Sequence, residues 1–163
     1  MLLGSTKAAS MKMKPQQSRS QFSLWAVLAA PLIISAPVGK LSAWDMATYS
    51  NAEVIAVSQD RLGKQGRALV YKQPLGSEVI IARDLDDGGV AMVFLNANFV
   101  ESTNVTCDAK CWSQTTFPAG TMLDVRDLWN HSEAALPRAV SGKPYSVPLY
   151  AGGYSATFKF TRH

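Results

Sequence analysis

The pattern after Gly66 limits the fold more than any other feature of the chain. Short runs of β-branched and aromatic residues recur there, each bounded by residues that favour turns. In the last run, Tyr154, Ala156, Phe158 and Phe160 alternate with polar residues, which gives one apolar face. Such alternation is typical of an antiparallel sheet with one buried face. The fold class is therefore mainly β, and residues 66–163 are predicted to form an antiparallel β-sandwich of about eight strands, of Greek-key type.

The expected strands share a short length, an apolar or β-branched composition and flanking turn residues. Hairpin turns are expected at Pro74–Gly76 and Asp86–Gly89, where Pro, Asp and Gly cluster. The expected strands are Arg67–Gln73, Ser77–Asp84, Val90–Asn96, Ser102–Thr106, Trp112–Thr116, Met122–Asp127, Tyr145–Leu149 and Tyr154–Phe160.

Residues 1–65 have a different pattern, and we interpret them as a separate unit. Gln16–Ala30 contains no Gly or Pro, and its apolar residues recur at spacings that favour one face of a helix. Leu32–Ile34 is apolar and predicts a strand buried on both faces, as in a parallel sheet. A second helix is expected to begin after Ser42, a suitable N-cap, and to end near Asn51.

The first segment has an alternative interpretation. Basic residues precede a 13-residue apolar run, Phe22–Ile34, which is the form of an export signal. The run is too short to span a membrane as a helix. In this alternative, residues 1–36 direct export, and the sandwich is a stand-alone secreted carbohydrate-binding or interaction module. An exposed aromatic platform would support the module, and Tyr150, Trp112 and Trp129 are candidates, although core positions suit all of them better.

Two cysteines and two sequence triplets favour a secreted or lysosomal origin. Cys107 and Cys111 lie close together, and a local disulfide is favoured over two unlinked thiols. Metal binding would need further ligands at short spacing, which neither of the two histidines supplies. Asn104-Val-Thr and Asn130-His-Ser match the acceptor pattern for N-glycosylation. Disulfides persist in oxidising compartments, where this modification also occurs.

The residues give no catalytic constellation. Asp84, Asp86 and Asp87 could be the paired carboxylates of a glycosidase, but a charged hairpin turn is the simpler interpretation. His131 lies in a polar turn with no nucleophile beside it in sequence. There is no glycine-rich phosphate loop and no basic stripe interleaved with aromatic residues. We therefore expect no cofactor, no bound metal and no nucleic-acid partner.

Several separated blocks carry a family resemblance. They are Gln21–Ile34, Glu53–Asp60, Leu62–Gly66 and Val125–Trp129, together with the Cys107/Cys111 pair. In this order they resemble glycoside hydrolase family 27, which comprises the α-galactosidases and α-N-acetylgalactosaminidases. The resemblance implies that residues 1–65 correspond to the last two helices and the last strand of a (β/α)8 barrel. Residues 66–163 would correspond to the C-terminal sandwich, and the export-signal interpretation is then disfavoured.

The resemblance implies a retaining hydrolase that acts on terminal non-reducing α-D-galactosyl residues. A complete (β/α)8 barrel needs about 250 residues, whereas the chain has 163. The family's Asp nucleophile and Asp acid/base belong to earlier barrel strands, and no position here matches either motif. We therefore assign no catalytic or substrate-binding residue and expect this chain alone to be inactive. The expected partners are an α-galactoside and the N-terminal part of the barrel, which would cover the apolar strand and helices.

Overall fold

The computed structural model describes residues 13–72, 77–132 and 136–163. The helices before the first strand are α1 (Pro15–Val27), the 3-10 helix η1 (Val38–Lys40), α2 (Ala43–Tyr49) and α3 (Ala52–Ser58). The helix expected after Ser42 is confirmed, because the Ser42 hydroxyl accepts a hydrogen bond from the backbone N–H of Asp45. Asn51 caps α3 in the same way, through the N–H groups of Glu53 and Val54. Helix α1 ends before the expected Ala30, because Ala29 adopts a left-handed conformation with φ of 56°.

The described residues form eight strands in two antiparallel sheets, and this confirms the predicted sandwich. The larger sheet has the order β1-β2-β3-β8-β5-β6, and the smaller one pairs β4 with β7. A short helix, α4 (Ala109–Trp112), follows β4. The strands are β1 (Arg67–Tyr71), β2 (Glu78–Asp84), β3 (Val90–Asn96), β4 (Thr103–Cys107), β5 (Met122–Asp127), β6 (Ala139–Val140), β7 (Tyr145–Leu149) and β8 (Ser155–Arg162).

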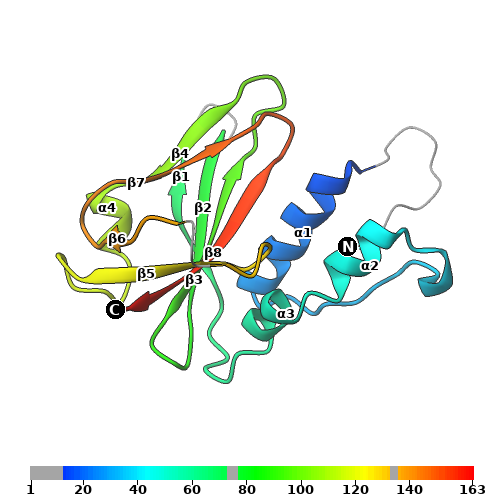
Figure 1. Ribbon diagram of the computed structural model, residues 1–163, viewed down its shortest axis with the longest axis horizontal. Helices are drawn as coiled ribbons and strands as arrows, with labels where there is room; N and C mark the ends of the chain where they lie inside the picture. Colours follow the sequence, from blue (N-terminus) through cyan, green and yellow to red (C-terminus); the bar gives the residue numbers. More distant parts are fainter. Residues whose placement is uncertain (1–12, 73–76, 133–135) are drawn as a thin grey trace.

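The six-stranded sheet lies between two layers, with α1, α2 and α3 on one side and the β4/β7 pair on the other (Figure 1). Strand β3 shows why both faces of this sheet are buried. Its residues Val90, Met92 and Phe94 point into the core beneath β4 and β7, while Ala91 and Val93 point towards the helices. The alternation of side chains along one strand thus supplies two separate cores.

The two cores differ in what covers the sheet. The first lies between the two sheets and is rich in aromatic rings, with Phe158 and Phe160 of β8 against Phe94. The second lies between the sheet and the helices. It contains Phe22, Trp25, Ala26, Val27, Tyr49, Val54, Val57, Leu85, Ala91, Val93 and Leu128. The helices are therefore bound to the sandwich through a continuous apolar layer.

Two expected strands are absent. Leu32–Ile34 belongs to neither sheet: it has a single bridge residue at Ile34, the N–H of Ile33 donates to the carbonyl oxygen of Pro31 at 3.1 Å, and the Ile33 side chain is 64% exposed. A parallel strand depends on neighbouring strands for its backbone hydrogen bonds, and the described residues offer it no parallel partner. Trp112–Thr116 instead continues the turn of α4, because the Asp108 carboxylate caps that helix by accepting from the N–H of Cys111.

Two glycines occupy positions that other residues would tolerate poorly. The expected hairpin at Asp86–Gly89 joins β2 to β3, and Gly88 has the positive φ of 78° that suits such a turn. The expected turn at Pro74–Gly76 lies outside the described residues. Gly66 marks the end of the helical segment, and a Cβ at this position would lie 2.3 Å from the carbonyl oxygen of Val27. Only glycine allows the chain to pass this close to the end of α1.

Candidate functional site

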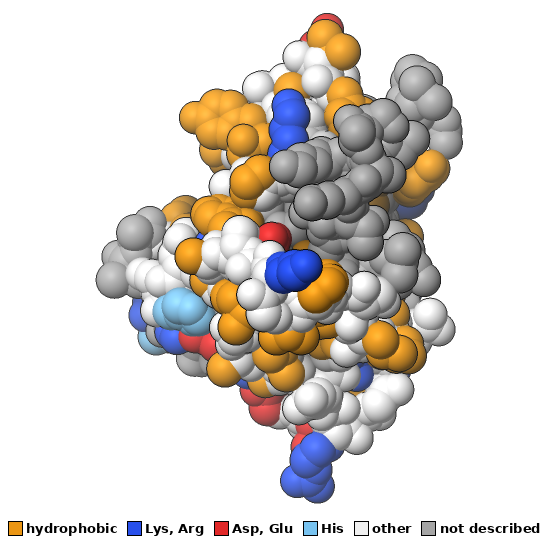
Figure 2. Space-filling model, turned by 90° about the vertical axis from the view of Figure 1, so that its right-hand side faces the viewer, with side chains coloured by type: hydrophobic (Ala, Val, Ile, Leu, Met, Phe, Trp, Pro, Cys, Tyr) orange, Lys and Arg blue, Asp and Glu red, His pale blue; other side chains and the backbone are white. Residues whose placement is uncertain are grey.

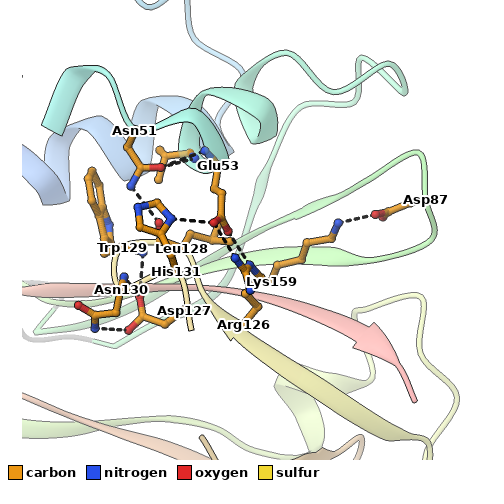
Figure 3. A network of polar contacts seen from close by, with 11 residues as sticks. Asn51, Glu53, Asp87, Arg126, Asp127, Leu128, Trp129, Asn130, His131 and Lys159 are labelled. Carbon is orange, nitrogen blue, oxygen red and sulfur yellow. Dashed lines mark hydrogen bonds and ion pairs between the residues drawn. The ribbon is translucent and has the colours of Figure 1, made fainter. Parts of the chain in front are cut away.

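A cluster of polar side chains joins α3 to the end of β5 and to the turn that follows it (Figure 3). The Glu53 carboxylate, in the first turn of α3, accepts hydrogen bonds from Arg126 Nε at 2.7 Å and Nη2 at 2.8 Å. His131 Nδ1 lies 2.7 Å from the same carboxylate. The guanidinium binds both carboxylate oxygens, which is the strongest geometry for such a pair. We call these residues and the backbone around them the junction.

Asn51 connects the same two elements through its amide. Its side-chain oxygen caps α3, and its side-chain nitrogen donates to the carbonyl oxygen of Leu128 at 2.9 Å. Asn51 is buried, with 6% of its surface exposed. Both ends of the amide are therefore satisfied, as a buried polar group requires.

Asp127 organises the turn that carries the junction. Its carboxylate accepts from the backbone N–H of Trp129 at 2.8 Å and of Asn130 at 3.0 Å. The turn returns to β5 where Ser132 pairs with Asp127, and His131 there has a φ of 54°. Histidine is one of the non-glycine residues that adopt this left-handed conformation more often than most. The result is a rigid loop that holds the His131 side chain towards Glu53 (Figure 3).

Helix α1 is held to the sheet by further polar contacts. Trp129 Nε1 donates to the Ser23 hydroxyl at 3.0 Å, and Thr157 donates to the same hydroxyl at 2.8 Å. The Arg19 guanidinium lies 3.9 Å from the ring centroid of Trp44 and 4.9 Å from that of Trp129. Stacking of this kind stabilises a partly buried cation. On the helical side of the molecule, acidic, basic and histidine side chains lie next to one another, and exposed hydrophobic side chains are scattered around them (Figure 2).

Arg83 connects the sheet with two helix ends. Its side chain is almost fully buried, with 1% of the residue exposed. Its Nη1 donates to the carbonyl oxygens of Ala26 and Ser58, both at 3.1 Å. These carbonyls lie at the C-terminal ends of α1 and α3, where the helix dipoles place negative partial charge. The buried cation is thus compensated by two helix ends.

The electrostatics of the junction suit binding between elements and oppose acid–base chemistry. Hydrogen bonds from Arg126, and to a smaller extent from His131, lower the pKa of Glu53 from 4.5 to about 2, although burial opposes the change. A general acid in a glycosidase needs a raised pKa near the working pH. Glu53 therefore stays ionised and acts as a permanent partner for Arg126.

The acidic residues singled out from the sequence also serve as ion-pair partners. Burial opposes ionisation of Asp84, yet hydrogen bonds from Arg67 at 3.0 Å and Lys64 at 2.6 Å hold its pKa below the usual range. The Lys159 ammonium binds Asp87 and lowers the pKa of that carboxyl. Asp84 ends β2 and is buried, whereas Asp86 and Asp87 lie in the following turn. The geometry therefore gives these carboxylates a structural use.

Of the remaining sequence candidates, Trp129, Asn130 and His131 lie at the junction, and the others lie apart from it. Cys107 and Cys111 form the expected disulfide at the start of α4. Asn104 lies on the exposed face of β4, whereas Asn130 belongs to the junction and donates to Asp127 at 2.7 Å. Trp112 is a core residue, as expected, and Trp129 is half-buried. The expectation of a core position is wrong for Tyr150, whose surface is 74% exposed.

The junction itself was not singled out from the sequence. Glu53 and Arg126 are 73 positions apart, and each looks like an ordinary surface charge in its own segment. The available signal was indirect: Val125–Trp129 is one of the blocks that carry the family resemblance, and Glu53 opens another. Within the described segments, no group of three or more His, Cys, Asp or Glu side chains could hold a metal ion. A search of the same segments finds no helix with the length and apolar character needed to cross a membrane.

Comparison with known proteins accounts for both units. Residues 8–60 match the family described as "Alpha galactosidase A", and residues 76–155 match its "C-terminal beta sandwich domain". The chain belongs to the α-galactosidase family. It is 37% identical over 131 residues to the α-galactosidase of Cyamopsis tetragonoloba, covering 80% of this chain and 29% of that protein. The chain thus spans less than a third of that relative.

Solved structures of the family share the fold. α-Galactosidase I of Mortierella vinacea superposes with a TM-score of 0.80 at 21% identity, over 96% of this chain and 38% of that one. A putative α-galactosidase/melibiase of Bacteroides fragilis gives a TM-score of 0.76 at 25% identity, over 94% of this chain and 30% of that one. Both the helices and the sandwich therefore keep the arrangement seen in longer family members.

Proposed function

We propose that this chain is the C-terminal portion of an α-galactosidase-like retaining hydrolase, which releases terminal non-reducing α-D-galactosyl residues from carbohydrates. The main support for the proposal is that the two family matches follow one another along the chain and that the junction connects them. The segment that matches the catalytic family model is fixed to the sandwich by the Glu53–Arg126 pair and by Asn51.

The proposed division of the chain follows the same logic. Residues 1–65 form the C-terminal end of a (β/α)8 barrel, and residues 66–163 form the sandwich that supports it. The contacts of α1 with the sheet, through Phe22, Trp25 and Val27, support a fixed relation between the two. In the whole enzyme, the N-terminal part of the barrel would be the main partner of this portion.

The proposed role of this portion is support, and the chemistry lies elsewhere in the enzyme. Retaining hydrolysis needs one carboxylate as nucleophile and a second as acid/base, about 5–5.5 Å apart. The carboxylates of Glu53, Asp84 and Asp87 are held by cations that lower their pKa. None of these three can deliver a proton at neutral pH, so this chain alone is expected to be inactive.

The stand-alone module is the less favoured alternative. An export signal over residues 1–36 would be removed, yet residues 15–27 form a helix whose apolar face completes the second core. The disulfide supports a secreted or lysosomal/vacuolar location for the parent enzyme, because such bonds persist in oxidising compartments.

A chimera tests the proposal. The present chain would replace the matching segment of the C. tetragonoloba α-galactosidase, and hydrolysis of nitrophenyl α-galactoside would be measured for this chimera and for the present chain alone. We expect turnover by the chimera, none with the β-anomer, and none by the chain alone. Near-ultraviolet circular dichroism reports whether the chimera is folded. A folded chimera without turnover overturns the supporting role, and turnover by the isolated chain overturns its proposed inactivity.

A further inference from the structure

The small sheet presents one face to solvent. Along β4, Val105 and Cys107 are buried, while Asn104 and Thr106 lie on the opposite, outward face. Strand β7 alternates in the same way, with Ser146 and Pro148 exposed. Asn104 lies opposite Pro148 in the register of the two strands. The outward face is therefore formed by short polar side chains and one proline, with no charged residue on either strand.

A shallow hollow of about 430 Å³ lies beside Asn104. Its walls combine apolar and small polar groups: Ser102, Thr103, Asn104, Pro148, Leu149 and Tyr150. The Tyr150 ring is 74% exposed and makes an edge contact with Tyr154, at 5.8 Å between ring centroids. An uncovered aromatic ring beside polar groups is the surface that a sugar ring covers well, since sugars present both C–H faces and hydroxyl groups.

The hollow is held in one shape by buried contacts. The side chain of Asn96 is fully buried, and its amide nitrogen donates to the carbonyl oxygens of Glu101 at 2.9 Å and Tyr150 at 3.1 Å. The Ser102 hydroxyl accepts from the N–H of Ala151 at 3.3 Å. The segments before β4 and after β7 are thus tied to each other, and a bound ring would not have to order them.

The two N-glycosylation triplets differ in what their asparagines do in the folded chain. Asn130 donates its amide nitrogen to Asp127 at 2.7 Å, within the junction. A sugar on that nitrogen would crowd the turn that carries His131. Asn104 is exposed, and the third residue of its triplet, Thr106, has its hydroxyl 2.8 Å from that of Ser146. The fold therefore has room for a glycan at Asn104.

We propose that Asn104 carries an N-linked glycan whose first sugar lies in the hollow against Tyr150 and Pro148. The donor is a lipid-linked diphospho-oligosaccharide of the secretory pathway. The Asn104 amide nitrogen forms a bond to the anomeric carbon of the sugar and loses one proton, which passes to the solvent. The bond from that carbon to the diphosphate breaks, and the lipid diphosphate leaves with the bonding electrons. The adjacent disulfide forms in the same oxidising compartment.

Secretion of the full chain from a eukaryotic host, behind a cleavable leader, tests the attachment site. Intact mass before and after treatment with a peptide N-glycosidase reports the glycan. We expect the glycan to be present in the wild type, in N130Q and in T106S, which keeps the acceptor pattern. We expect it to be absent from N104Q and T106A. S146A is the matched control for T106A, because it removes the same hydroxyl contact and leaves the triplet intact. An unmodified wild type, or a glycan that persists in N104Q, overturns the proposal.

A second measurement tests where the first sugar lies. An endoglycosidase trims the glycan to the single sugar attached to Asn104, and thermal unfolding compares this protein with N104Q. We expect the trimmed protein to have a midpoint higher by roughly 2–4 °C, the size of a modest stabilising contact in a chain of this length. In Y150A the difference should vanish. An equal difference with and without the Tyr150 ring overturns the placement in the hollow, and the mass data still decide the attachment site.

Discussion

The Glu53–Arg126 pair allows a quantitative test of the junction. The substitution Glu53→Gln keeps the size of the side chain and removes its charge. Lowering the pKa of Glu53 from 4.5 to about 2 corresponds to roughly 3 kcal/mol, at about 1.4 kcal/mol per pH unit. The Arg126 side chain is 35% exposed, so water screens the pair, and we expect E53Q to lower the free energy of unfolding by about 1.5–2 kcal/mol at neutral pH.

The same pair predicts the direction of the pH dependence. The folded-state pKa of Glu53 lies below its unfolded value of 4.5. Its contribution is therefore fully present above that value and disappears as the pH falls towards about 2. The stability difference between the wild type and E53Q should be largest at neutral pH and shrink steadily on acidification.

Urea unfolding followed by circular dichroism, from neutral pH down to about pH 3, measures this difference. E78Q is the matched control, since Glu78, which is 16% exposed, pairs at 2.7 Å with Lys72, a cation that is 55% exposed. We expect E78Q to lower the free energy of unfolding by no more than about 0.5 kcal/mol. Equal losses in E53Q and E78Q, or a loss in E53Q that does not change with pH, would refute the reasoning.

Three further substitutions test packing elsewhere in the fold. Arg83→Met should lower the free energy of unfolding by about 2–4 kcal/mol, because the carbonyls of Ala26 and Ser58 lose their charged donor. Hydrogen exchange in α1 and α3 should become faster, whereas R61M, at a side chain that is 88% exposed, should leave it unchanged. Gly66→Ala should lower the free energy of unfolding by about 1–3 kcal/mol, because the new Cβ would lie 2.3 Å from the Val27 carbonyl oxygen. Denaturant titration measures this loss against G39A, whose new Cβ would have no atom within 4 Å. Trp112→Ala should lower the free energy of unfolding by about 3–5 kcal/mol, because the side chain fills the first core and its indole N–H donates to the carbonyl oxygen of Lys143 at 2.7 Å. A loss below about 1 kcal/mol, measured by calorimetry, would contradict a core role.

The sequence was sufficient to predict those strands and helices whose formation depends on neighbouring residues in the chain. Short runs of β-branched and aromatic residues between turn residues predicted β3 and β5 at their observed bounds, because such runs are typical of strands whatever their distant partners. The caps at Ser42 and Asp108 are equally local, but the second was overlooked, so Trp112–Thr116 was given to a strand when it belongs to a helical turn. The order of the family blocks indicated the family before any contact was known.

The tertiary structure decided what depends on distant partners. Leu32–Ile34 has the composition of a buried strand, yet a strand forms only where another strand supplies its hydrogen bonds. Glu53 became a permanent anion because folding brings Arg126 and His131 within 2.7 Å of it. The exposure of Tyr150 and the different settings of Asn104 and Asn130 depend on which strands pair and which turns close. Composition and periodicity act along the chain, whereas these properties are set by contacts between residues far apart in it.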